Sequence, residues 1–335
     1  IQNSTTAPSI APGEAIFPPP SSLTAGQRAQ AEQRLAGMEL GSESVFVAGR
    51  ALDTLLREFG VRPDLLLGHS TGENDALMAS GLFQLDEAEL ADLVRRMNRN
   101  YRQLEAAGEL PPGVLLSVGG IALERARVLL EADPTLHLTM DNCDNQFILF
   151  GPEASVDAVH AALRAEGALC VRLPMDYGYH TPLMEPMAQA FHALFEKVAV
   201  GEPEGAPYSC VTAAPFPLEP VEARAAAAAQ YRSPVRFRES IQRLYADGAR
   251  LFVEVGPSPY LTGFVRDILK QQPHVAVAGD DRRRNDLTPL RHLLATLFVH
   301  GVPVDLSVLY GPPPAAPGNP SPYLSSAIPI IRLDE

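Results

Sequence analysis

The chain has 335 residues, of which 46% are apolar and 20% are charged, and its formal net charge is −13 at pH 7. This length and apolar content predict a folded protein of about two domains with a large core. The acidic balance argues against a nucleic-acid partner, and no tract of Lys and Arg interleaved with aromatic residues occurs in the sequence.

The sequence also argues against a membrane protein. No apolar run approaches the ~20 residues needed to span a bilayer, and the N-terminal residues lack the basic and then apolar pattern of a signal peptide. We therefore expect a cytoplasmic protein with no membrane partner. Cys143, Cys170 and Cys210 are widely spaced and odd in number, which fits neither a disulfide framework nor a CxxC metal site. Buried thiols and no metal site are expected.

The first part of the chain has an α/β pattern. Residues 1–23 are rich in Pro, Ser and Thr and predict a loop, whereas residues 24–35 begin with a capping residue and predict a helix. Apolar residues recur at helical spacing over residues 45–59, and Gly60 is a helix-ending signal. The stretch "VRPDLLLG" then predicts a short buried strand directly before "HSTG".

The middle of the chain has a different rhythm. It predicts a strand, a helix, two strands, a helix and a strand, at residues 113–120, 122–133, 136–142, 146–151, 154–167 and 168–175. This βαββαβ order is that of a ferredoxin-like unit, and Asp144-Asn145 supplies turn residues for its central hairpin. Since α/β character stands on both sides of it, we expect an inserted small subdomain.

The last part returns to α/β character. Helices are predicted over residues 180–198, 222–232 and 235–248, followed by a strand, a Gly-Pro turn and a helix over residues 249–269. Residues 311–335 are Pro-rich and are expected to wrap over the surface or to lead into another domain. The expected organisation is a large α/β subdomain, a ferredoxin-like subdomain and a Pro-rich C-terminal linker, at residues 24–111 with 181–305, 112–180 and 306–335.

Ser70 is the first candidate for chemistry. In a strand, G-x-S-x-G, helix arrangement the serine occupies a sharp turn that holds its hydroxyl above the sheet. The helix N-terminus directs amides at that place, so the N–H of Thr71 could stabilise an oxyanion, a contribution of ~2.7 to 4 kcal/mol per donor. The alternative is that Ser70 is an ordinary N-cap. The motif alone leaves both interpretations open.

A serine nucleophile needs a base, and histidine is the usual one. His180 stands in "MDYGYHTPLMEP", where the chain leaves the inserted unit and a cleft between subdomains is expected. His292 and His300 are rivals in an esterase-like order of Ser, acid and His. His69 adjoins the serine, but consecutive residues on such a turn point apart, which favours a packed neighbour.

Several motifs together carry a resemblance to a known family. They are "GHSTGE" (68–73), Arg95 in "LVRRM", "YGYH" (177–180), "QYRSPVRF" (230–237) and "FVEVGPSPYL" (252–261). In this order and spacing they resemble the malonyl-type acyltransferase domains of polyketide and fatty acid synthases. With "IFPPP" upstream, the set is most similar to the iterative synthases that make enediyne cores, which are enzymes of antibiotic biosynthesis. The resemblance implies an α/β-hydrolase-like large subdomain with an inserted ferredoxin-like small subdomain.

The resemblance also implies a ping-pong mechanism. Ser70 would attack the thioester of malonyl-CoA, with His180 as general base and then acid. The acyl group would pass to the phosphopantetheine thiol of an acyl carrier protein. A carbonyl oxygen at Gln230 would orient His180, which makes a serine-histidine dyad rather than a triad; one acceptor suffices to fix the imidazole tautomer. No bound cofactor is implied, and the partners are the carrier protein and other domains of a multidomain synthase.

Substrate choice is expected at three places. Arg95 matches the residue that clamps the free carboxylate of malonyl groups, although a solvated helix arginine is the alternative because three other arginines stand nearby. Tyr179, at the third position of "YGYH", is expected to fill the space of a 2-methyl branch, which binding alone discriminates by only ~1 to 3 kcal/mol. Tyr177 resembles the methylmalonyl pattern, so the motif is mixed, and malonyl is predicted. His69 completes the expected substrate-binding set.

One departure and two rival functions remain. Family members carry an upstream F-P-G-Q-G segment that supplies a second oxyanion donor, and nothing in this sequence matches it. Either that segment lies upstream or the oxyanion hole is built differently. The rivals are a serine esterase or thioesterase, which needs an Asp or Glu behind the histidine, and a silent interaction module. Because carrier proteins are acidic, docking needs a local basic patch; the candidates are Arg232, Arg236, Arg238 and Arg282 to Arg284.

Overall fold

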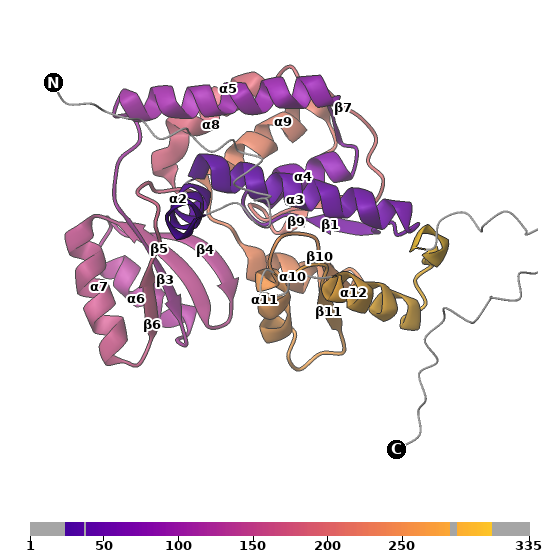
Figure 1. The fold of residues 1–335 in the computed structure, drawn as a ribbon. Helices are drawn as coiled ribbons and strands as arrows, with labels where there is room; N and C mark the ends of the chain where they lie inside the picture. Colours follow the sequence, from indigo (N-terminus) through magenta and orange to yellow (C-terminus); the bar gives the residue numbers. More distant parts are fainter. Residues whose placement is uncertain (1–23, 37, 282–286, 310–335) are drawn as a thin grey trace, which may run out of the picture.

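A computed structural model describes residues 24–36, 38–281 and 287–309 of the chain (Figure 1). The loop expected at residues 1–23, the arginines at 282–284 and the Pro-rich segment from residue 310 onward lie outside the described residues. No described helix is long and apolar enough to cross a bilayer.

The described elements alternate between helices and short strands. The α-helices are α2 (Ala25–Ala36), α3 (Met38–Glu58), α4 (Gly72–Ala79), α5 (Glu87–Ala106), α6 (Leu123–Ala132), α7 (Glu153–Ala165), α8 (Glu185–Phe195), α9 (Pro220–Ala229), α10 (Phe237–Ala246), α11 (Tyr260–Ile268) and α12 (Thr288–Val299). The strands are β1 (Leu65–Leu67), β2 (Phe83–Gln84), β3 (Val114–Gly119), β4 (His137–Cys143), β5 (Gln146–Gly151), β6 (Leu169–Arg172), β7 (Ala199–Val200), β8 (Ala206–Ser209), β9 (Ala214–Pro215), β10 (Leu251–Glu254) and β11 (Val275–Ala278). The 3-10 turns are η1 (Pro182–Met184), η2 (Gln230–Arg232) and η3 (Leu306–Leu309).

The inserted unit is a four-stranded antiparallel sheet with two helices. Its strand order is β4-β5-β3-β6, and α6 and α7 follow β3 and β5 in the chain. This is the spatial order of a ferredoxin-like unit, so the predicted βαββαβ arrangement is confirmed. In Figure 1 the unit forms a separate lobe at the lower left.

Both faces of this small sheet are covered, because side chains alternate along each strand. Leu116 and Val118 of β3 point to one face and are buried against α6 and α7. Leu115, which precedes Leu116 and so points to the other face, belongs to the largest core of the molecule, together with buried residues of α8 and α10. The small sheet is therefore packed between its own helices and the large subdomain.

The large subdomain contains two parallel strand pairs. In one pair β1 runs beside β8, with Leu65 opposite Ala206, and in the other β10 runs beside β11. Helices α3 and α12 pack on β10 and β11 through a separate apolar cluster that includes Leu56, Val277 and Leu293. Parallel strands buried between helices are typical of α/β folds. This architecture agrees with the expected α/β-hydrolase-like large subdomain.

The small sheet is joined to α10 by its edge strand β4. The N–H of Asp141 donates to the carbonyl of Val235 at 2.9 Å, and the N–H of Val235 donates to Thr139 at 2.9 Å. The guanidinium of Arg238 then forms a two-pronged ion pair with the Asp141 carboxylate, with contacts from 2.9 to 3.2 Å. Backbone and side-chain bonds thus fix the two subdomains at one seam.

One expected helix begins later than predicted. Residues 180–198 have a helical pattern, but His180 and Thr181 precede η1, and α8 covers only Glu185–Phe195. His180 has a φ of 64°, which no helix contains. The helical pattern correctly predicts α8, but His180 lies in the connection that leads to this helix.

Candidate active site

Ser70 lies on a tight turn between β1, which ends at Leu67, and α4, which begins at Gly72. Its φ of 55° is left-handed, a conformation that non-glycine residues adopt rarely and mostly at functional sites. A Cβ on Gly68 would lie 2.0 Å from the carbonyl oxygen of Gly72, so only glycine fits there. The helix N-cap is Thr71, not Ser70. The interpretation of Ser70 as a mere N-cap is therefore wrong.

His180 is held in an equally unusual conformation. Its φ is 64°, and the residue is only 4% exposed. The "YGYH" glycine allows this, because a Cβ on Gly178 would lie 2.7 Å from the ring of Phe150. The hydroxyl of Thr181 donates to the Gly178 carbonyl at 2.6 Å and closes the turn. The strained turn directs the imidazole toward α4.

Ser70 and His180 form a hydrogen-bonded pair. Ser70 Oγ lies 2.7 Å from His180 Nε2, and His180 Nδ1 lies 2.8 Å from the carbonyl oxygen of Gln230. A carbonyl can only accept, so Nδ1 carries the proton and Nε2 is free to accept from the serine hydroxyl. The rival histidines His292 and His300 are exposed on and after α12. The group behind His180 is a carbonyl, which makes the arrangement a dyad.

The surroundings of His180 keep it neutral. Burial lowers its pKa to about 4, and the hydrogen bond to Gln230 opposes that shift only in part. At neutral pH the imidazole is therefore in the form that can accept a proton.

The backbone N–H of Thr71 is available at the start of α4. The N–H groups of residues 72–74 donate to the carbonyls of residues 69–71, at 3.0, 2.8 and 3.2 Å. Within the described part of the chain, no hydrogen bond uses the N–H of Thr71. It lies next to Ser70 at a helix N-terminus, which is a suitable place for an oxyanion. Its role remains a prediction.

His69 points away from Ser70. Its Nε2 lies 2.7 Å from Oδ1 of Asn142, and its ring packs edge-on against Phe237 at 5.3 Å between centroids. Burial lowers its pKa, so this imidazole is also neutral at pH 7. The contacts agree with a packed neighbour that joins the turn between β1 and α4 to β4; contact with substrate stays a prediction.

The two tyrosines of "YGYH" are braced by α5. Tyr179 is 4% exposed, and its hydroxyl lies 2.7 Å from that of Tyr101. The Tyr177 hydroxyl donates to Glu105 at 3.0 Å, and the ring of Tyr177 packs edge-on against both other tyrosines. Helix α5 therefore holds the aromatic segment that precedes His180.

Arg95, also on α5, is not brought to the dyad. Its side chain is 69% exposed, and its ion-pair partner is Asp92 at 4.0 Å. Among the described residues it makes no hydrogen bond to Ser70 or His180. Its predicted role as a carboxylate clamp is untested by these contacts and would require the side chain to turn toward the site.

The arginines expected to dock a carrier protein are already paired. Arg232 contacts Glu185 at 2.7 Å, Arg236 contacts Glu239, and Arg238 contacts Asp141 at 2.9 Å. Each charge is thus neutralised locally, which weakens the expectation of a basic patch there.

Two polar residues that follow Ser70 were missed in the sequence. Glu73 is 1% exposed and accepts from Ser209 Oγ at 3.0 Å and from the N–H of Cys210 at 3.1 Å, which ties α4 to β8. Burial raises its pKa to about 7. Asn74 bonds to side chains of η2. The polar run Glu73-Asn74-Asp75 at the start of a helix that is otherwise apolar was the available signal.

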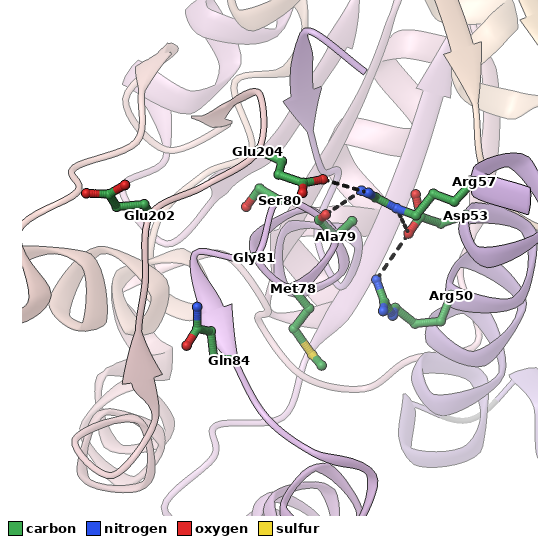
Figure 2. A pocket seen from close by; sticks show the side chains of 10 residues that line it. All are labelled: Arg50, Asp53, Arg57, Met78, Ala79, Ser80, Gly81, Gln84, Glu202 and Glu204. Carbon is green, nitrogen blue, oxygen red and sulfur yellow. Dashed lines mark hydrogen bonds and ion pairs between the residues drawn. The ribbon is translucent and has the colours of Figure 1, made fainter. Parts of the chain in front are cut away.

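A cavity of about 390 Å³ lies elsewhere, between α3 and the segment after α4 (Figure 2). Figure 2 shows the Arg57 guanidinium between Glu204 and Asp53, donating to both carboxylates and to the Ala79 carbonyl. Neither Ser70 nor His180 lines this cavity, and the charge of Arg57 is already paired. It is distinct from the dyad.

Comparisons with known proteins agree with this site. A family model described as "Acyl transferase domain" matches residues 22–304. The mycoketide-CoA synthase of Mycobacterium tuberculosis is 32% identical over 84% of this chain, which spans only 6% of that protein. The malonyl CoA-acyl carrier protein transacylase of Bacillus subtilis is 27% identical over 67% of this chain and 71% of its own length.

A solved structure is also similar. It is the acyltransferase domain of an iterative polyketide synthase in enediyne biosynthesis, with a TM-score of 0.67 and 29% identity, covering 82% of this chain and 69% of that one. The family match over most of the chain agrees with the serine elbow and the ferredoxin-like insert. This chain belongs to the acyl transferase domain family, whose members include domains of polyketide synthases and malonyl CoA-acyl carrier protein transacylases.

Proposed function

We propose that this domain transfers a malonyl group from malonyl-CoA, through an ester on Ser70, to the phosphopantetheine thiol of an acyl carrier protein in polyketide biosynthesis. The observation that carries the proposal is the distance of 2.7 Å between Ser70 Oγ and His180 Nε2, with the Gln230 carbonyl on the other ring nitrogen. The similarity to a malonyl CoA-acyl carrier protein transacylase and to a polyketide synthase domain supports the reaction type.

In the first half-reaction Ser70 Oγ attacks the thioester carbonyl carbon while its proton passes to His180 Nε2. The carbonyl oxygen becomes an oxyanion, which accepts a hydrogen bond from the N–H of Thr71. When the carbonyl reforms, the carbon–sulfur bond breaks, and the proton on Nε2 goes to the departing coenzyme A sulfur. A malonyl ester of Ser70 and free coenzyme A result.

The second half-reaction reverses these roles. The carrier-protein thiol gives its proton to Nε2 and its sulfur attacks the ester carbonyl. Collapse of the oxyanion then returns the proton to Ser70 Oγ. Because each product leaves before the next substrate binds, the kinetics are ping-pong. The neutral state of His180 suits both half-reactions, since Nε2 must be unprotonated at the start of each.

Selection of malonyl groups is assigned to α5 and the "YGYH" segment. Arg95 binds the free carboxylate of the substrate, and Tyr177, Tyr179 and His69 surround the acyl group. Tyr179 is buried and hydrogen-bonded to Tyr101, so its ring has little freedom to move aside for a 2-methyl branch. This rigidity supports malonyl over methylmalonyl.

A serine esterase or thioesterase is the second candidate, and the geometry disfavours it. Such a triad places a carboxylate behind the histidine to stabilise the imidazolium. Here the acceptor at Nδ1 is the neutral carbonyl of Gln230. The function as a silent interaction module is disfavoured because Ser70 and His180 both hold left-handed backbone conformations, which are costly, and their Oγ and Nε2 atoms lie within hydrogen-bonding distance.

Intact mass measurement after incubation with malonyl-CoA tests the proposal. A covalent malonyl adduct should form on the wild-type protein, be absent from Ser70→Ala, and disappear when a carrier protein with its phosphopantetheine arm is added. Malonyl-carrier protein should appear in its place. Release of free malonate instead would support the thioesterase, and the lack of any adduct would support the silent module.

A further inference from the structure

Asn74 lies on α4, four residues after Ser70, and binds two residues of a distant turn. Its Oδ1 accepts from Gln230 Nε2 at 3.0 Å, and its Nδ2 donates to the hydroxyl of Tyr231 at 2.9 Å. Gln230 and Tyr231 are consecutive residues of η2, more than 150 positions away along the chain. The Asn74 amide thus forms hydrogen bonds with two adjacent side chains of this turn.

The same turn holds His180 by its backbone. The carbonyl of Gln230 accepts from the imidazole at 2.8 Å, and the carbonyl of Tyr231 accepts from the backbone N–H of His180 at 3.0 Å. The position of the imidazole, in its ring and in its main chain, therefore depends on where η2 sits.

Asn74 is in turn fixed to the serine turn. Its N–H donates to the carbonyl of Thr71 at 3.2 Å, at the start of the same helix. A continuous series of bonds thus connects Ser70, His180, η2, Asn74 and α4. We propose that Asn74 is a positioning residue that keeps His180 Nε2 at hydrogen-bonding distance from Ser70 Oγ; the inference rests on the proposed acyl transfer.

Burial makes this link costly to lose. Gln230 is 2% exposed and Tyr231 is 9% exposed, with its ring packed edge-on against Phe191 at 4.7 Å. Solvent has little access to replace the Asn74 amide. The Gln230 amide keeps a second partner, the Ala227 carbonyl at 3.1 Å, so η2 is expected to shift rather than unfold. An unpaired buried polar group drives such shifts.

A shift of η2 should affect chemistry more than binding. Asn74 makes its side-chain bonds to η2, so it has no direct part in holding coenzyme A or the acyl group. Displacing a catalytic group by ~1 Å can cost about 10²-fold in rate. The expected signature is a slower acylation step with an unchanged half-saturating concentration of malonyl-CoA.

The test measures the acylation rate by intact mass at several malonyl-CoA concentrations. Asn74→Leu, which has similar size and no polar atoms, should slow acylation by about 10- to 100-fold while the half-saturating concentration changes less than about twofold. Asn74→Asp retains an acceptor for Gln230 Nε2 and can accept from the Tyr231 hydroxyl, so it should restore the rate to within about fivefold of wild type. Tyr231→Phe, which removes one oxygen, should acylate at a rate between those of Asn74→Leu and Asn74→Asp.

Asn100→Leu is the matched control. Asn100 donates to the Ala190 carbonyl at 3.4 Å and links α5 to α8 without touching η2. It should acylate at the wild-type rate. The inference is overturned if Asn74→Leu acylates within twofold of wild type, or if Asn74→Asp is as slow as Asn74→Leu. Should Asn74→Leu not fold, a wild-type rate in Tyr231→Phe overturns it. A wild-type protein that forms no adduct refutes the proposed function instead.

Discussion

His180 combines a reactive position with an unusual protonation state. Its ring is buried, its Nδ1 proton is committed to the Gln230 carbonyl, and its pKa is lowered to about 4. Burial disfavours the charged form, so a proton binds only well below the usual range.

The pH dependence of acylation should reflect this shift. Because the neutral imidazole is the base, kcat/KM for acyl-enzyme formation should be level from about pH 8 down to about pH 5 and should fall by half near pH 4. An unshifted histidine would give half-loss near pH 6.5. Rates from intact mass, with circular dichroism at each pH to verify folding, distinguish the two; half-loss at pH 6 or above would contradict the buried, neutral dyad.

Arg95 is the residue whose sequence-based role has the least structural support. Its side chain is exposed and its contact with Asp92 is long, at 4.0 Å, so it is not locked in place.

Arg95→Ala should slow malonyl loading by about 10- to 100-fold, since a hydrogen bond to a charged group contributes ~1.5 to 3 kcal/mol. Loading of an acetyl group, which has no free carboxylate, should not change. Arg96→Ala is the control, because Arg96 is exposed and bound to Asp92 at 2.6 Å. Equal loss of malonyl and acetyl loading, or no loss of either, would contradict the clamp.

At the scale of elements, the junction between β1 and α4 decides whether a nucleophile is presented. The two glycines of G-x-S-x-G have different roles in it. A Cβ on Gly68 would lie 2.0 Å from the Gly72 carbonyl oxygen, whereas a Cβ on Gly72 would meet no described atom within 4 Å. Of the two glycines, only Gly68 therefore prevents a collision.

Substitution of the two glycines should separate these roles. Gly68→Ala must push the strand away from the helix and should lower the free energy of unfolding by at least ~2 kcal/mol. Gly72→Ala, in the first turn of α4, should change it by less than about 1 kcal/mol and can raise it, since alanine favours helix. Urea unfolding of both variants is the measurement. Equal destabilisation would show that the close approach at Gly68 is not rigid.

At the scale of the molecule, function depends on how the inserted unit sits on the large subdomain. Ser70 belongs to the large subdomain, and the turn that carries His180 lies where the chain leaves the inserted unit. The seam between β4 and α10 includes Arg238 and Asp141, whose side chains are 19% and 4% exposed.

Arg238→Met should therefore cost ~3 to 5 kcal/mol in the free energy of unfolding, because it leaves the Asp141 carboxylate buried without its partner. Arg125→Met removes an arginine from the exposed pair with Glu166 in the small subdomain and should leave the free energy of unfolding almost unchanged, because solvent screens that pair. Denaturant titration compares them directly. If both variants lose the same free energy of unfolding, the ion pair between Arg238 and Asp141 does not fix the two subdomains together.

The order of elements and the turn that carries Ser70 followed from local signals. Period-2 and helical patterns predicted the βαββαβ insert, and the serine between two glycines after an apolar run predicted the elbow. The periodicity of the sequence did not predict where helix α5 begins and ends, although Asp86 and Glu89 form a capping box at its start. The first turn of the predicted 180–198 helix was wrong. His180 has a left-handed φ, its N–H donates to Tyr231 of η2, and the preceding Gly178 packs closely against Phe150; these partners are distant in the chain.

The sequence by itself determined the fold class and named Ser70 and His180 as a candidate pair, because these depend on patterns within short segments and on motifs that keep their order. Only the tertiary structure decided that Ser70 Oγ and His180 Nε2 lie 2.7 Å apart, that Arg95 faces solvent, and that Asn74 joins α4 to the turn η2 behind His180. Those properties arise from burial and from hydrogen bonds between residues far apart in the chain, and no local pattern of residues encodes such distances.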